Sequence, residues 1–555
     1  MITNETGTTA TRNSIPENLR NPSSFPLKEV EDDLERGNAE EEFDDNDTTT
    51  KETNGAALDN NDLARTKSSV SIADTMSLPH EILFVAIICL AQFMTQAGLG
   101  QCLAILHIIG ASFSLTNPGS LSWLIAGYSL TVGTFILFSG RLGDVFGYKR
   151  LLIIGFSWFS LWSLVAGLSI YSNHVLFVFA RVLQGIGPAI VLPNGLAILG
   201  ATYAPGRRKD MVFALFGACA PGGALVGGVF AALFALTWWP WAFFSFAIAL
   251  AVTAMVSVWV IPEGPRKPDH AKKSLGEKIK DLDLPGAVTG ITALVLFNFA
   301  WNQAPIVGWQ KAYIIVTLIL GVAFFGLFFY IELNVARAPL IPFGILSADV
   351  AFVLACVALG WSCFGIWVYY SYQYMQVLRG ISPLLSMAWA SPLAISGAAA
   401  AVTTGFLLSK LRPAWVMTLA MTFFLTGVIL IATDPVDQIY WGQTFFCFIV
   451  TCWGMDMSFP AATIILSNSV SRKGAQGLSA SLVTTIVNYS ISLGLGFAGT
   501  VEVNQNNGGI TRADILKGYR AALYMGVGLA GGGLIVSTIF LLRSYILDRQ
   551  KRREL

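Results

Sequence analysis

The chain has 555 residues, of which 54% are hydrophobic and 12% are charged, and its mean hydropathy of +0.61 lies far above that of an average soluble domain. The net charge of +1 averages two unlike regions, because half of the 34 acidic residues fall within the first 80 positions. This composition excludes an ordinary soluble domain and indicates a chain that lies mostly within a membrane.

Residues 1–80 form an acidic tail rich in Asn, Thr, Glu and Asp, with an acidic run from Glu40 to Asp47. Such a segment cannot bury enough apolar surface to offset its chain entropy, so we expect it to be disordered. It also lacks the apolar core of a signal peptide. The folded region is therefore expected to begin after this tail.

Apolar segments of about 20 residues or more follow, which is the length that a helix needs to cross the hydrocarbon core. They are expected near residues 82–110, 121–140, 151–171, 175–203, 211–235, 241–262, 284–303, 312–333, 350–376, 384–408, 414–433, 440–467, 475–500 and 519–543. The count is fourteen, and an even number of spans puts both termini on the same side.

The basic residues orient these spans. Alternate loops and the C-terminal tail hold 22 Lys and Arg residues on one side, whereas the opposite loops hold only five. Those five are Lys311, Arg379, Arg512, Lys517 and Arg520. Because basic residues concentrate in cytosolic loops, we expect both termini in the cytosol.

The spans divide into two groups of six. We expect a disordered acidic cytosolic tail (1–80), an N-terminal six-helix half (81–262), a basic cytosolic loop (263–283), two linking helices (284–333), a C-terminal six-helix half (334–543) and a basic cytosolic tail (544–555). The expected fold is therefore an all-α polytopic membrane protein with two similar halves, each containing inverted repeats.

Residues 140–150, GRLGDVFGYKR, form a charged turn between the second and third spans. Glycine accepts positive φ cheaply, so the backbone can reverse within a few residues. We expect Asp144 just before the next helix, where the N-terminal dipole favours a carboxylate. The turn is expected to act on helix docking between conformational states; the alternative is an ordinary tight cytosolic loop. Its motif residues are Gly140, Leu142, Asp144, Gly147, Lys149 and Arg150.

Arg181 is the only basic residue well inside a span, in the segment RVLQGIG with Gln184 at i+3. A charged side chain at that depth is costly and normally faces a cavity or a partner. We expect Arg181 to have a functional role at such a cavity. The alternative is a structural arginine held by backbone carbonyls.

The fifth span contains GACAPGGALVGG, residues 217–228. Small residues let neighbouring helices approach closely, and a proline within the helix bends it. We expect a helix-packing motif made by Gly217, Pro221, Gly223 and Gly227. Close packing without any role in antiport is the alternative.

Asp456 is the only acidic residue near the middle of a span, in CWGMDMSFPAATIILS. A lone carboxyl in a low-dielectric environment can take up and release a proton near neutral pH. Pro460 at i+4 frees a backbone carbonyl that could orient it. We therefore expect Asp456 to bind the coupling proton; the alternative is a structural Asp paired with an Asn or Ser of a neighbouring helix.

Five polar residues on the spans are candidates for the substrate pathway, namely Gln92, Gln96, Gln184, Asn298 and Asn488. Gln92 and Gln96 share one helix face, and His107 lies near the outer end of the same span. Interhelical hydrogen bonding explains such residues about as well as substrate contact does.

Two residue types are expected to have structural roles. The seven cysteines fall in apolar runs without a CxxC pair, so we expect neither disulfides nor a metal site, and no cofactor motif is present. Tyr369, Tyr370, Tyr372 and Tyr374 fall at an expected outer boundary, where an aromatic belt is the default.

These motifs carry a family resemblance. The turn at 140–150 resembles the loop between helices two and three of the major facilitator superfamily, whose pattern is roughly GxLxDxxGxKR. RVLQGIG resembles the fourth-helix motif RxxQGxG of its proton antiporters, in which the arginine is implicated in proton transfer. GACAPGGALVGG is a loosened match to the glycine–proline motif of drug:proton antiporters, because Pro221 comes one residue early.

Residues 81–543 are similar to one fungal branch of the fourteen-helix drug:proton antiporters, through stretches such as AQFMTQAGLGQ, GMDMSFPAATIILS and LKGYRAALYMG. This branch includes aminotriazole-resistance and borate-efflux proteins and low-affinity ammonium transporters. The first span departs from the family pattern LDxTxVNxALP, because Gln96 replaces the acid, Gln101 the Asn and Ile105 the Pro. Gln96 cannot titrate, so the coupling proton must be bound elsewhere.

The resemblance implies proton-coupled efflux of small toxic or metabolic compounds by alternating access, at the plasma membrane or the vacuolar membrane. The alternative is a low-affinity uniporter for a small ion such as ammonium; a nutrient receptor with an inactive transporter core is disfavoured. An enzyme is not expected, since the sequence has no P-loop and no nucleophile with a base at a recognised spacing. The expected partners are a small-molecule substrate, protons and the lipid bilayer, with no nucleic acid and a monomeric chain.

Overall fold

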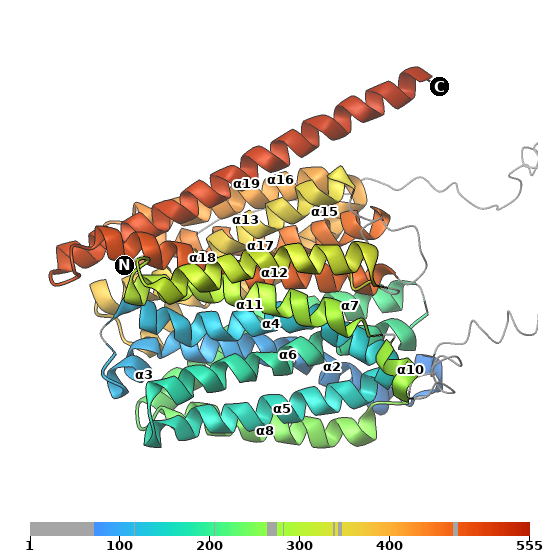
Figure 1. The fold of residues 1–555 in the computed structure, drawn as a ribbon, viewed down its shortest axis with the longest axis horizontal. Helices are drawn as coiled ribbons and strands as arrows, with labels where there is room; N and C mark the ends of the chain where they lie inside the picture. The colour runs from blue at the N-terminus through green and yellow to red at the C-terminus, as the bar shows by residue number, and fades with distance from the viewer. Residues whose placement is uncertain are drawn as a thin grey trace, which may run out of the picture. The chain divides into compact units, whose positions relative to one another are not determined.

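The computed structural model describes residues 72–115, 117–204, 206–263, 275–280, 282–336, 339–341, 347–469 and 475–554. These residues form a bundle of helices without a β-strand (Figure 1). Most of the expected acidic tail and most of the basic loop at 263–283 lie outside the described residues.

The helices of the N-terminal half lie between Ile72 and Val260. They are η1 (Ile72–Thr75), α2 (Leu78–Ala104), α3 (Leu106–Ser112), α4 (Pro118–Phe146), α5 (Tyr148–Leu168), η2 (Ser169–Tyr171), α6 (His174–Thr202), α7 (Arg207–Ala235) and α8 (Pro240–Val260). A short helix and the two linking helices come next: α10 (Leu275–Lys280), α11 (Leu284–Val307) and α12 (Ala312–Asn334).

The C-terminal half contains the remaining helices. They are α13 (Ala348–Gln373), its π-helical continuation η4 (Tyr374–Leu378), α14 (Pro383–Ala390), α15 (Pro392–Lys410), α16 (Pro413–Ala432), α17 (Gln443–Ser469), α18 (Ala475–Gln505) and α19 (Arg512–Glu554).

The number of spans agrees with the sequence prediction. Among the described residues, 14 segments are long and apolar enough to cross a membrane. The shortest, Pro413–Ala432, has 20 residues, which at 1.5 Å per residue matches a hydrocarbon core of about 30 Å. The chain is therefore a multi-pass membrane protein.

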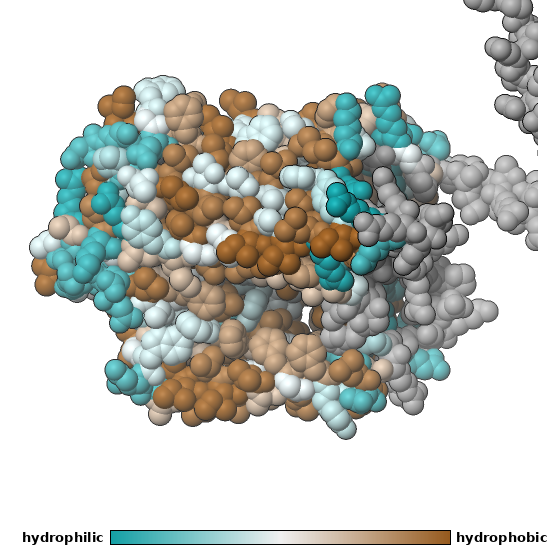
Figure 2. Space-filling view, turned by 90° about the horizontal axis from the view of Figure 1, so that it is seen from above, coloured by the Kyte–Doolittle hydropathy of each residue, from teal (hydrophilic) through white to brown (hydrophobic). Residues whose placement is uncertain are grey.

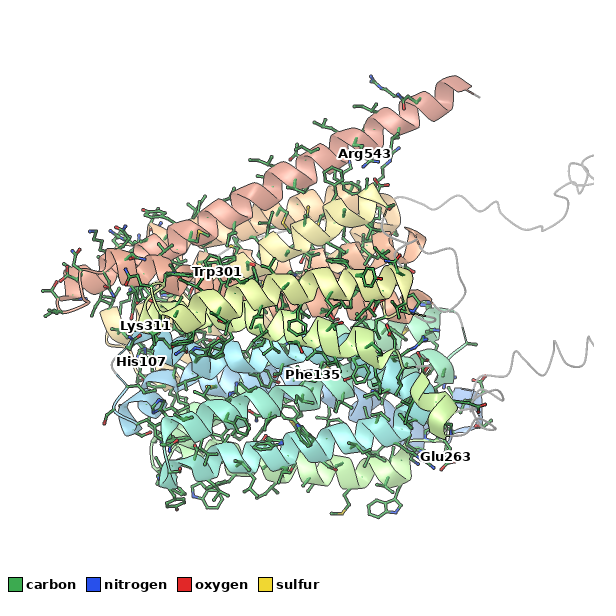
Figure 3. All side chains as sticks on the ribbon, in the orientation of Figure 1. His107, Phe135, Glu263, Trp301, Lys311 and Arg543 are labelled. Carbon is green, nitrogen blue, oxygen red and sulfur yellow. The ribbon has the colours of Figure 1, made fainter. Side chains whose placement is uncertain are left out.

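The surface of the bundle fits this assignment. Figure 2 shows a hydrophobic middle, with hydrophilic residues gathered at the left end. Figure 3 places His107 and Lys311 at that end of the bundle, whereas Glu263 lies at the opposite end. Lipid would cover the hydrophobic middle, because backbone polar groups are satisfied inside the helices.

Local sequence signals explain where several helices begin. The Asn117 side chain accepts a hydrogen bond from Gly119 N (2.8 Å) immediately before Pro118, and Asn173 accepts one from Leu176 N (2.9 Å) at the start of α6. Asparagine satisfies an orphan N–H at a helix start, and proline fits the first turn, where its missing N–H costs nothing.

The two halves meet along two seams. In one, α4 packs against α18, and in the other α7 packs against α14 and α15. The linking helix α11 contacts both α4 and α18 and so covers the first seam from outside, while α12 packs on α11. At Gly133 of α4, a Cβ atom would lie 2.6 Å from the backbone N of Tyr489, so glycine is required for this close approach.

The structure corrects three local expectations. Helix α4 runs to Phe146, so the turn is confined to Gly147 with φ of 99°, and Asp144 lies in the last turn of α4 rather than at the start of α5. Helix α19 continues to Glu554, past the expected span boundary at residue 543. The four tyrosines, Tyr369, Tyr370, Tyr372 and Tyr374, do not form a lipid-facing belt, because each is buried among neighbouring helices.

Candidate functional site

A cavity of about 2850 Å³ lies between the two halves. Residues of α2, α4, α6 and α7 line it from the N-terminal half, and residues of α13, α15, α17 and α18 line it from the C-terminal half. The cavity reaches Leu103 and Tyr372 at its deep end and Lys149, Glu263 and Leu340 at its mouth. We call the end of the bundle that carries the mouth the open end.

The opposite end, which we call the closed end, is held by contacts between the halves. His107 Nε2, on α3, hydrogen-bonds Oε1 of Gln373 on α13. Gln376 Nε2 donates to the backbone O of Ala104 (2.9 Å) and lies 3.0 Å from Ser386 Oγ. Gly228 of α7 lies against Met387 of α14 with no room for a Cβ atom. The structure is therefore one conformation of a molecule that is open at one end only.

Asp456 lies in the cavity wall, at the midpoint of α17. Its Oδ2 atom is buried and has no hydrogen-bond partner within the described part of the chain. Gly397 of α15 makes room for this carboxyl, because a Cβ atom there would lie 3.0 Å from Oδ2 and 3.1 Å from Pro221 Cγ of α7. Asp456 thus lies where α7 and α15 of the two halves approach each other.

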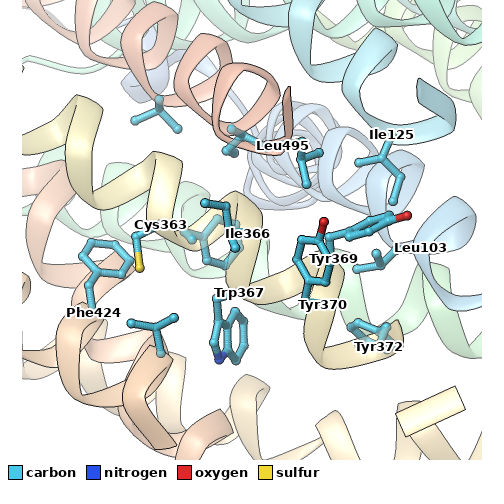
Figure 4. Close-up of a cluster of buried hydrophobic side chains, with 14 of the residues drawn as sticks. Leu103, Ile125, Cys363, Ile366, Trp367, Tyr369, Tyr370, Tyr372, Phe424 and Leu495 are labelled. Carbon is cyan, nitrogen blue, oxygen red and sulfur yellow. The ribbon is translucent and has the colours of Figure 1, made fainter. Parts of the chain in front are cut away.

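Helix α13 contributes an aromatic face to the cavity wall. Its aromatic members on α13 are Trp361, Phe364, Trp367 and Tyr372. Trp361 Nε1 donates to Ser458 Oγ of α17 (3.1 Å), which fixes the indole beside the helix that carries Asp456. Figure 4 shows Trp367 and Tyr372 on the same helix segment as Tyr369 and Tyr370. Aromatic faces favour apolar and cationic groups.

Three of the five pathway candidates line this cavity. Gln92 and Gln96 line it from α2, and Asn488 lines it from α18, where its amide also donates to Thr484 O (3.0 Å). Two other acidic residues, Asp144 and Glu263, line the cavity, and both lie at its mouth. In this conformation Asp456 is therefore the acidic group of the deep cavity.

The other two pathway candidates lie outside the cavity, which corrects that expectation for this conformation. Gln184 is fully buried and donates to Ser163 Oγ (2.6 Å). Asn298 is also fully buried, with its Oδ1 atom 2.9 Å from Ser492 Oγ, which is itself 2.9 Å from the backbone O of Ala126. Asn298 therefore joins α11 to the α4–α18 seam by hydrogen bonding.

Arg181 is likewise fully buried and is not part of the cavity wall. Its Nε atom donates to the backbone O of Leu124 (3.1 Å), Nη1 donates to Gln184 Oε1, and the guanidinium lies 4.5 Å from the ring centroid of Tyr128. Tyr128 OH in turn donates to the backbone O of Thr95 in α2 (2.8 Å). Arg181 thus ties α6 to α4 and, through Tyr128, to α2 in this conformation.

The turn motif surrounds the mouth. Gly140, Asp144, Gly147, Lys149 and Arg150 line it, while Leu142 is half-buried beside them. Tyr148 OH donates to Asp144 Oδ1 (2.6 Å), which joins the end of α4 to the start of α5.

The residues of the glycine–proline motif have different surroundings. Gly223 and Gly227 lie against the backbone oxygens of Phe93 and Ala97 in α2, where a Cβ atom could not fit. Gly217 faces open space, and Pro221 lines the cavity. Only part of the motif therefore packs helices together in this conformation.

Sequence reasoning missed several buried polar residues. Asn194 of α6 fills the space beside Gly143 of the turn, and Glu502 of α18 accepts a hydrogen bond from Tyr370 OH (2.7 Å). At the closed end, Asp434 Oδ2 pairs with Arg379 Nη2 (3.0 Å), and burial raises the pKa of this carboxyl, which lies between two spans. A single helix sequence carries no signal for such partners, because they come from distant helices.

Two six-helix halves, a pair of linking helices and a cavity open at one end are the features of a membrane transporter. A family model for the Major Facilitator Superfamily matches residues 83–495. The chain belongs to the Major Facilitator Superfamily.

Several relatives cover nearly the whole chain. The low affinity ammonium transporter of Saccharomyces cerevisiae is 53% identical over 91% of this chain and 96% of its own length. The efflux pump terJ of Aspergillus terreus is 47% identical over 88% of this chain and 93% of its own, and the aminotriazole resistance protein of Saccharomyces cerevisiae is 37% identical over 85% and 86%. These proteins are fungal transporters of the branch that the sequence resembles.

A solved structure supports the fold independently. The crystal structure of a peptide transporter POT mutant in complex with sulfate aligns with a TM-score of 0.60 over 88% of this chain and 98% of that one. At 15% identity, the likeness concerns the fold alone.

Proposed function

We propose that this membrane transporter exports small compounds in exchange for protons, and that Asp456 binds the coupling proton. The observation that carries the proposal is a carboxyl in the wall of the central cavity, with an oxygen that accepts no hydrogen bond from the described part of the chain. Burying a carboxylate without a partner is costly, so the group gains from binding either a proton or a polar cargo.

The exchange follows from one site with two occupants. With the cavity open, cargo enters and occupies the space between the aromatic wall and Asp456, and the proton leaves to solvent. When the other end opens, cargo departs and a proton returns to the carboxyl. Gln96 cannot replace Asp456 in this step, because an amide has no titratable proton in this pH range.

The direction of export depends on which end faces the cytosol. We propose that the open end is cytosolic, because the loops at that end carry the basic residues of the turn at 140–150 and of residues 207–209. Both termini would then lie in the cytosol. The plasma membrane is the proposed location, with the vacuolar membrane as the alternative. We also propose that a single chain forms the whole transport pathway and that it catalyses no reaction.

Arg181 has an indirect part in this proposal. In the present conformation its guanidinium is held by Leu124 and Gln184 and does not line the cavity. It would influence proton release by fixing the packing of α6 against α4 and α2. A direct approach to Asp456 would require the other conformation.

The second candidate is a low-affinity uniporter for a small ion such as ammonium. Two observations favour it: the 53% identity to a low affinity ammonium transporter, and the absence of an acid at Gln96 in the first span. A uniporter would use the same cavity without obligatory proton exchange.

Purified protein in proteoliposomes separates the two candidates. The experiment imposes a cargo gradient without a pH gradient and records the internal pH with a trapped dye. Antiport predicts proton movement opposite to the cargo, at a rate that depends on cargo concentration. Cargo flux that leaves the internal pH unchanged and ignores an imposed ΔpH would support the uniporter.

A further inference from the structure

The buried acidic side chains away from the cavity fall into two kinds. Glu81 pairs with Arg208, Asp434 pairs with Arg379, and Asp283 accepts from the backbone N of Gly286 (3.2 Å). Glu332 accepts from the backbone N of Leu340 (3.2 Å). Each of these carboxyls has a cation or a backbone N–H as a partner, and Asp283 and Glu332 also face each other beside Gly286.

Glu502 is of the other kind. It lies near the end of α18, is 3% exposed, and forms no ion pair with a basic residue within the described ranges. Among the described residues, its hydrogen-bond donor is the hydroxyl of Tyr370, 2.7 Å from Oε2. Among the buried acids it therefore resembles Asp456, although the two lie on different helices and Glu502 is outside the cavity wall.

The groups that face Glu502 are mostly phenols. Tyr369 and Tyr370 face it from α13 and Tyr519 from α19, with the rings of Tyr370 and Tyr519 5.6 Å apart. The α11 sequence contains no ionisable residue, and the charged residues of α4, Arg141 and Asp144, lie at its open end.

Most of the other charged groups on the elements that pack against α18 have partners of their own, and Asp456 lies away from Glu502 in the cavity wall. On α19, Arg520 donates to the backbone O of Asp434 (3.2 Å), and Lys517 lies near Asp514. On α6, the guanidinium of Arg181 is held by Leu124 and Gln184, and on α17, Asp456 lies at mid-helix in the cavity wall.

The same segment of α13 connects Glu502 to the contact that closes the bundle. Tyr369 hydrogen-bonds Gln373 one turn further along α13, and Gln373 is the residue that accepts from His107. The Tyr369 and Tyr370 rings are 5.0 Å apart, edge to face. Figure 4 shows this pair beside Leu103 of α2, Ile125 of α4 and Leu495 of α18. Opening of the closed end must break the His107–Gln373 bond and release this segment.

We propose that Glu502 is a second proton-binding site, which exchanges its proton with the solvent at the closed end when the His107–Gln373 contact opens. The proton adds to a carboxylate oxygen from solvent and returns there, and no other bond changes. Asp456 would then exchange protons through the open end and Glu502 through the closed end. The inference takes the direction of transport from the proposed function, but proton binding by Glu502 does not depend on it.

Infrared difference spectroscopy of the purified protein in lipid tests proton binding without transport. A protonated carboxyl has a carbonyl stretching band that an ionised carboxylate lacks. We expect the acid-minus-alkaline spectrum of wild-type protein to contain such a band that ¹³C-glutamate labelling shifts and Glu502→Gln removes. Gln keeps an oxygen that accepts from Tyr370, so packing is preserved while titration is lost. The proposal is overturned if Glu502→Gln leaves every glutamate band in place.

A second variant keeps the test decisive if Glu502→Gln folds poorly. Tyr370→Phe removes the one donor and keeps the carboxyl, so the ¹³C-sensitive band should remain but move in frequency. Glu332→Gln is the matched control, since it removes a buried glutamate that accepts from two backbone N–H groups and faces Asp283 instead of tyrosine hydroxyls. A band that follows Glu332 and not Glu502 also overturns the proposal.

The transport readout separates this inference from the proposed function. In proteoliposomes, the logarithm of the transport rate is plotted against the pH at the closed side. The slope of this plot counts the protons bound there, and it should be smaller by about 1 in Glu502→Gln than in wild type. Cargo counterflow without ΔpH should be unchanged. If wild-type transport ignores ΔpH altogether, antiport is wrong, while the infrared band still reports whether Glu502 binds a proton. An unchanged slope with antiport intact would contradict the assignment of Glu502.

Discussion

Arg181 in the N-terminal half and Asp456 in the C-terminal half look alike in the sequence, as single charged residues within apolar helices. Their surroundings differ. Within the described residues each has one buried polar atom without a hydrogen-bond partner, Nη2 of Arg181 and Oδ2 of Asp456. Arg181 is nevertheless fully enclosed and held by Leu124, Gln184 and Tyr128, whereas Asp456 lines the cavity. A charged residue inside a span is costly, so it is kept for a purpose. Its contacts show whether that purpose is to hold helices together or to face the cavity.

The comparison assigns different tasks to the two halves in this conformation. The N-terminal half supplies tightly joined helices, since Arg181 and the close glycine contacts of Gly223 and Gly227 fix α2, α4, α6 and α7 together. The C-terminal half supplies the titratable group and the aromatic wall.

The largest effect is expected for Arg181→Ala. Removal of the guanidinium leaves the Leu124 carbonyl and Gln184 Oε1 without donors in a buried site, which should cost about 3 kcal/mol of stability. Arg181→Lys keeps the charge and should retain more stability and more transport. Thermal unfolding in detergent and flux per folded molecule measure both, with the exposed Arg207→Ala as control. Equal transport by the two Arg181 variants would show that charge at this depth has no part in transport.

The second prediction concerns His107, on α3 outside the spans. Burial lowers the pKa of His107 to about 4, whereas a solvated imidazole titrates near about 6.5. The neutral ring thus stabilises the closed end fully above about pH 6.5, and this contribution is lost as the pH falls. Between pH 7.5 and pH 5, protonation should raise the open-to-closed ratio of this end by up to about thirtyfold.

His107→Gln can keep a hydrogen bond to Gln373 but cannot titrate. We expect this variant to lose the acid-induced opening, measured as the labelling rate of a cysteine introduced beneath the closed end. His80→Gln is the control, since His80 lies on α2 and hydrogen-bonds the backbone O of Val260. Acid-induced opening that persists in His107→Gln would assign it to another group.

Asp144→Asn should have a smaller effect, of about tenfold on transport. Asn can accept from Tyr148 but replaces a charge-assisted hydrogen bond with a neutral one, a difference of about 1.4 kcal/mol. Membrane insertion should be intact, because the residue lies at the mouth rather than in the hydrophobic middle. Tyr148→Phe, which removes the donor, should have a similar effect. Normal transport by inserted Asp144→Asn would exclude a role of the turn in conformational change.

The smallest effect distinguishes a residue of the seam from one of the cavity. Asn298→Ala should lower stability by about 1 kcal/mol through the lost interhelical hydrogen bonds, with cargo affinity unchanged. Asn488→Ala should raise the KM for cargo severalfold with little change in unfolding temperature. Reversal of this pattern would mean that the pathway runs beside α11 in another conformation.

The sequence predicted the fourteen spans because hydropathy reports how long an apolar segment is. It also identified Asp456, whose position at mid-helix is visible in one helix alone. It did not predict the enclosure of Gln184 and Asn298, since a helix sequence does not specify which neighbour faces each side chain. Glu502 was missed because it lies three residues before the end of α18, where an acid is expected at the membrane rim. The extension of α4 to Phe146 was missed because the charged residues suggested an early end.

Asp456→Asn tests the central claim most directly. In proteoliposomes with an imposed ΔpH, wild-type protein should concentrate cargo against its gradient, whereas Asp456→Asn should carry out cargo counterflow at the wild-type rate and concentrate nothing. Asp456→Glu should retain partial accumulation, since its carboxyl titrates but is displaced by one methylene. If Asp456→Asn still concentrates cargo under ΔpH, Asp456 does not bind the coupling proton and the account is wrong.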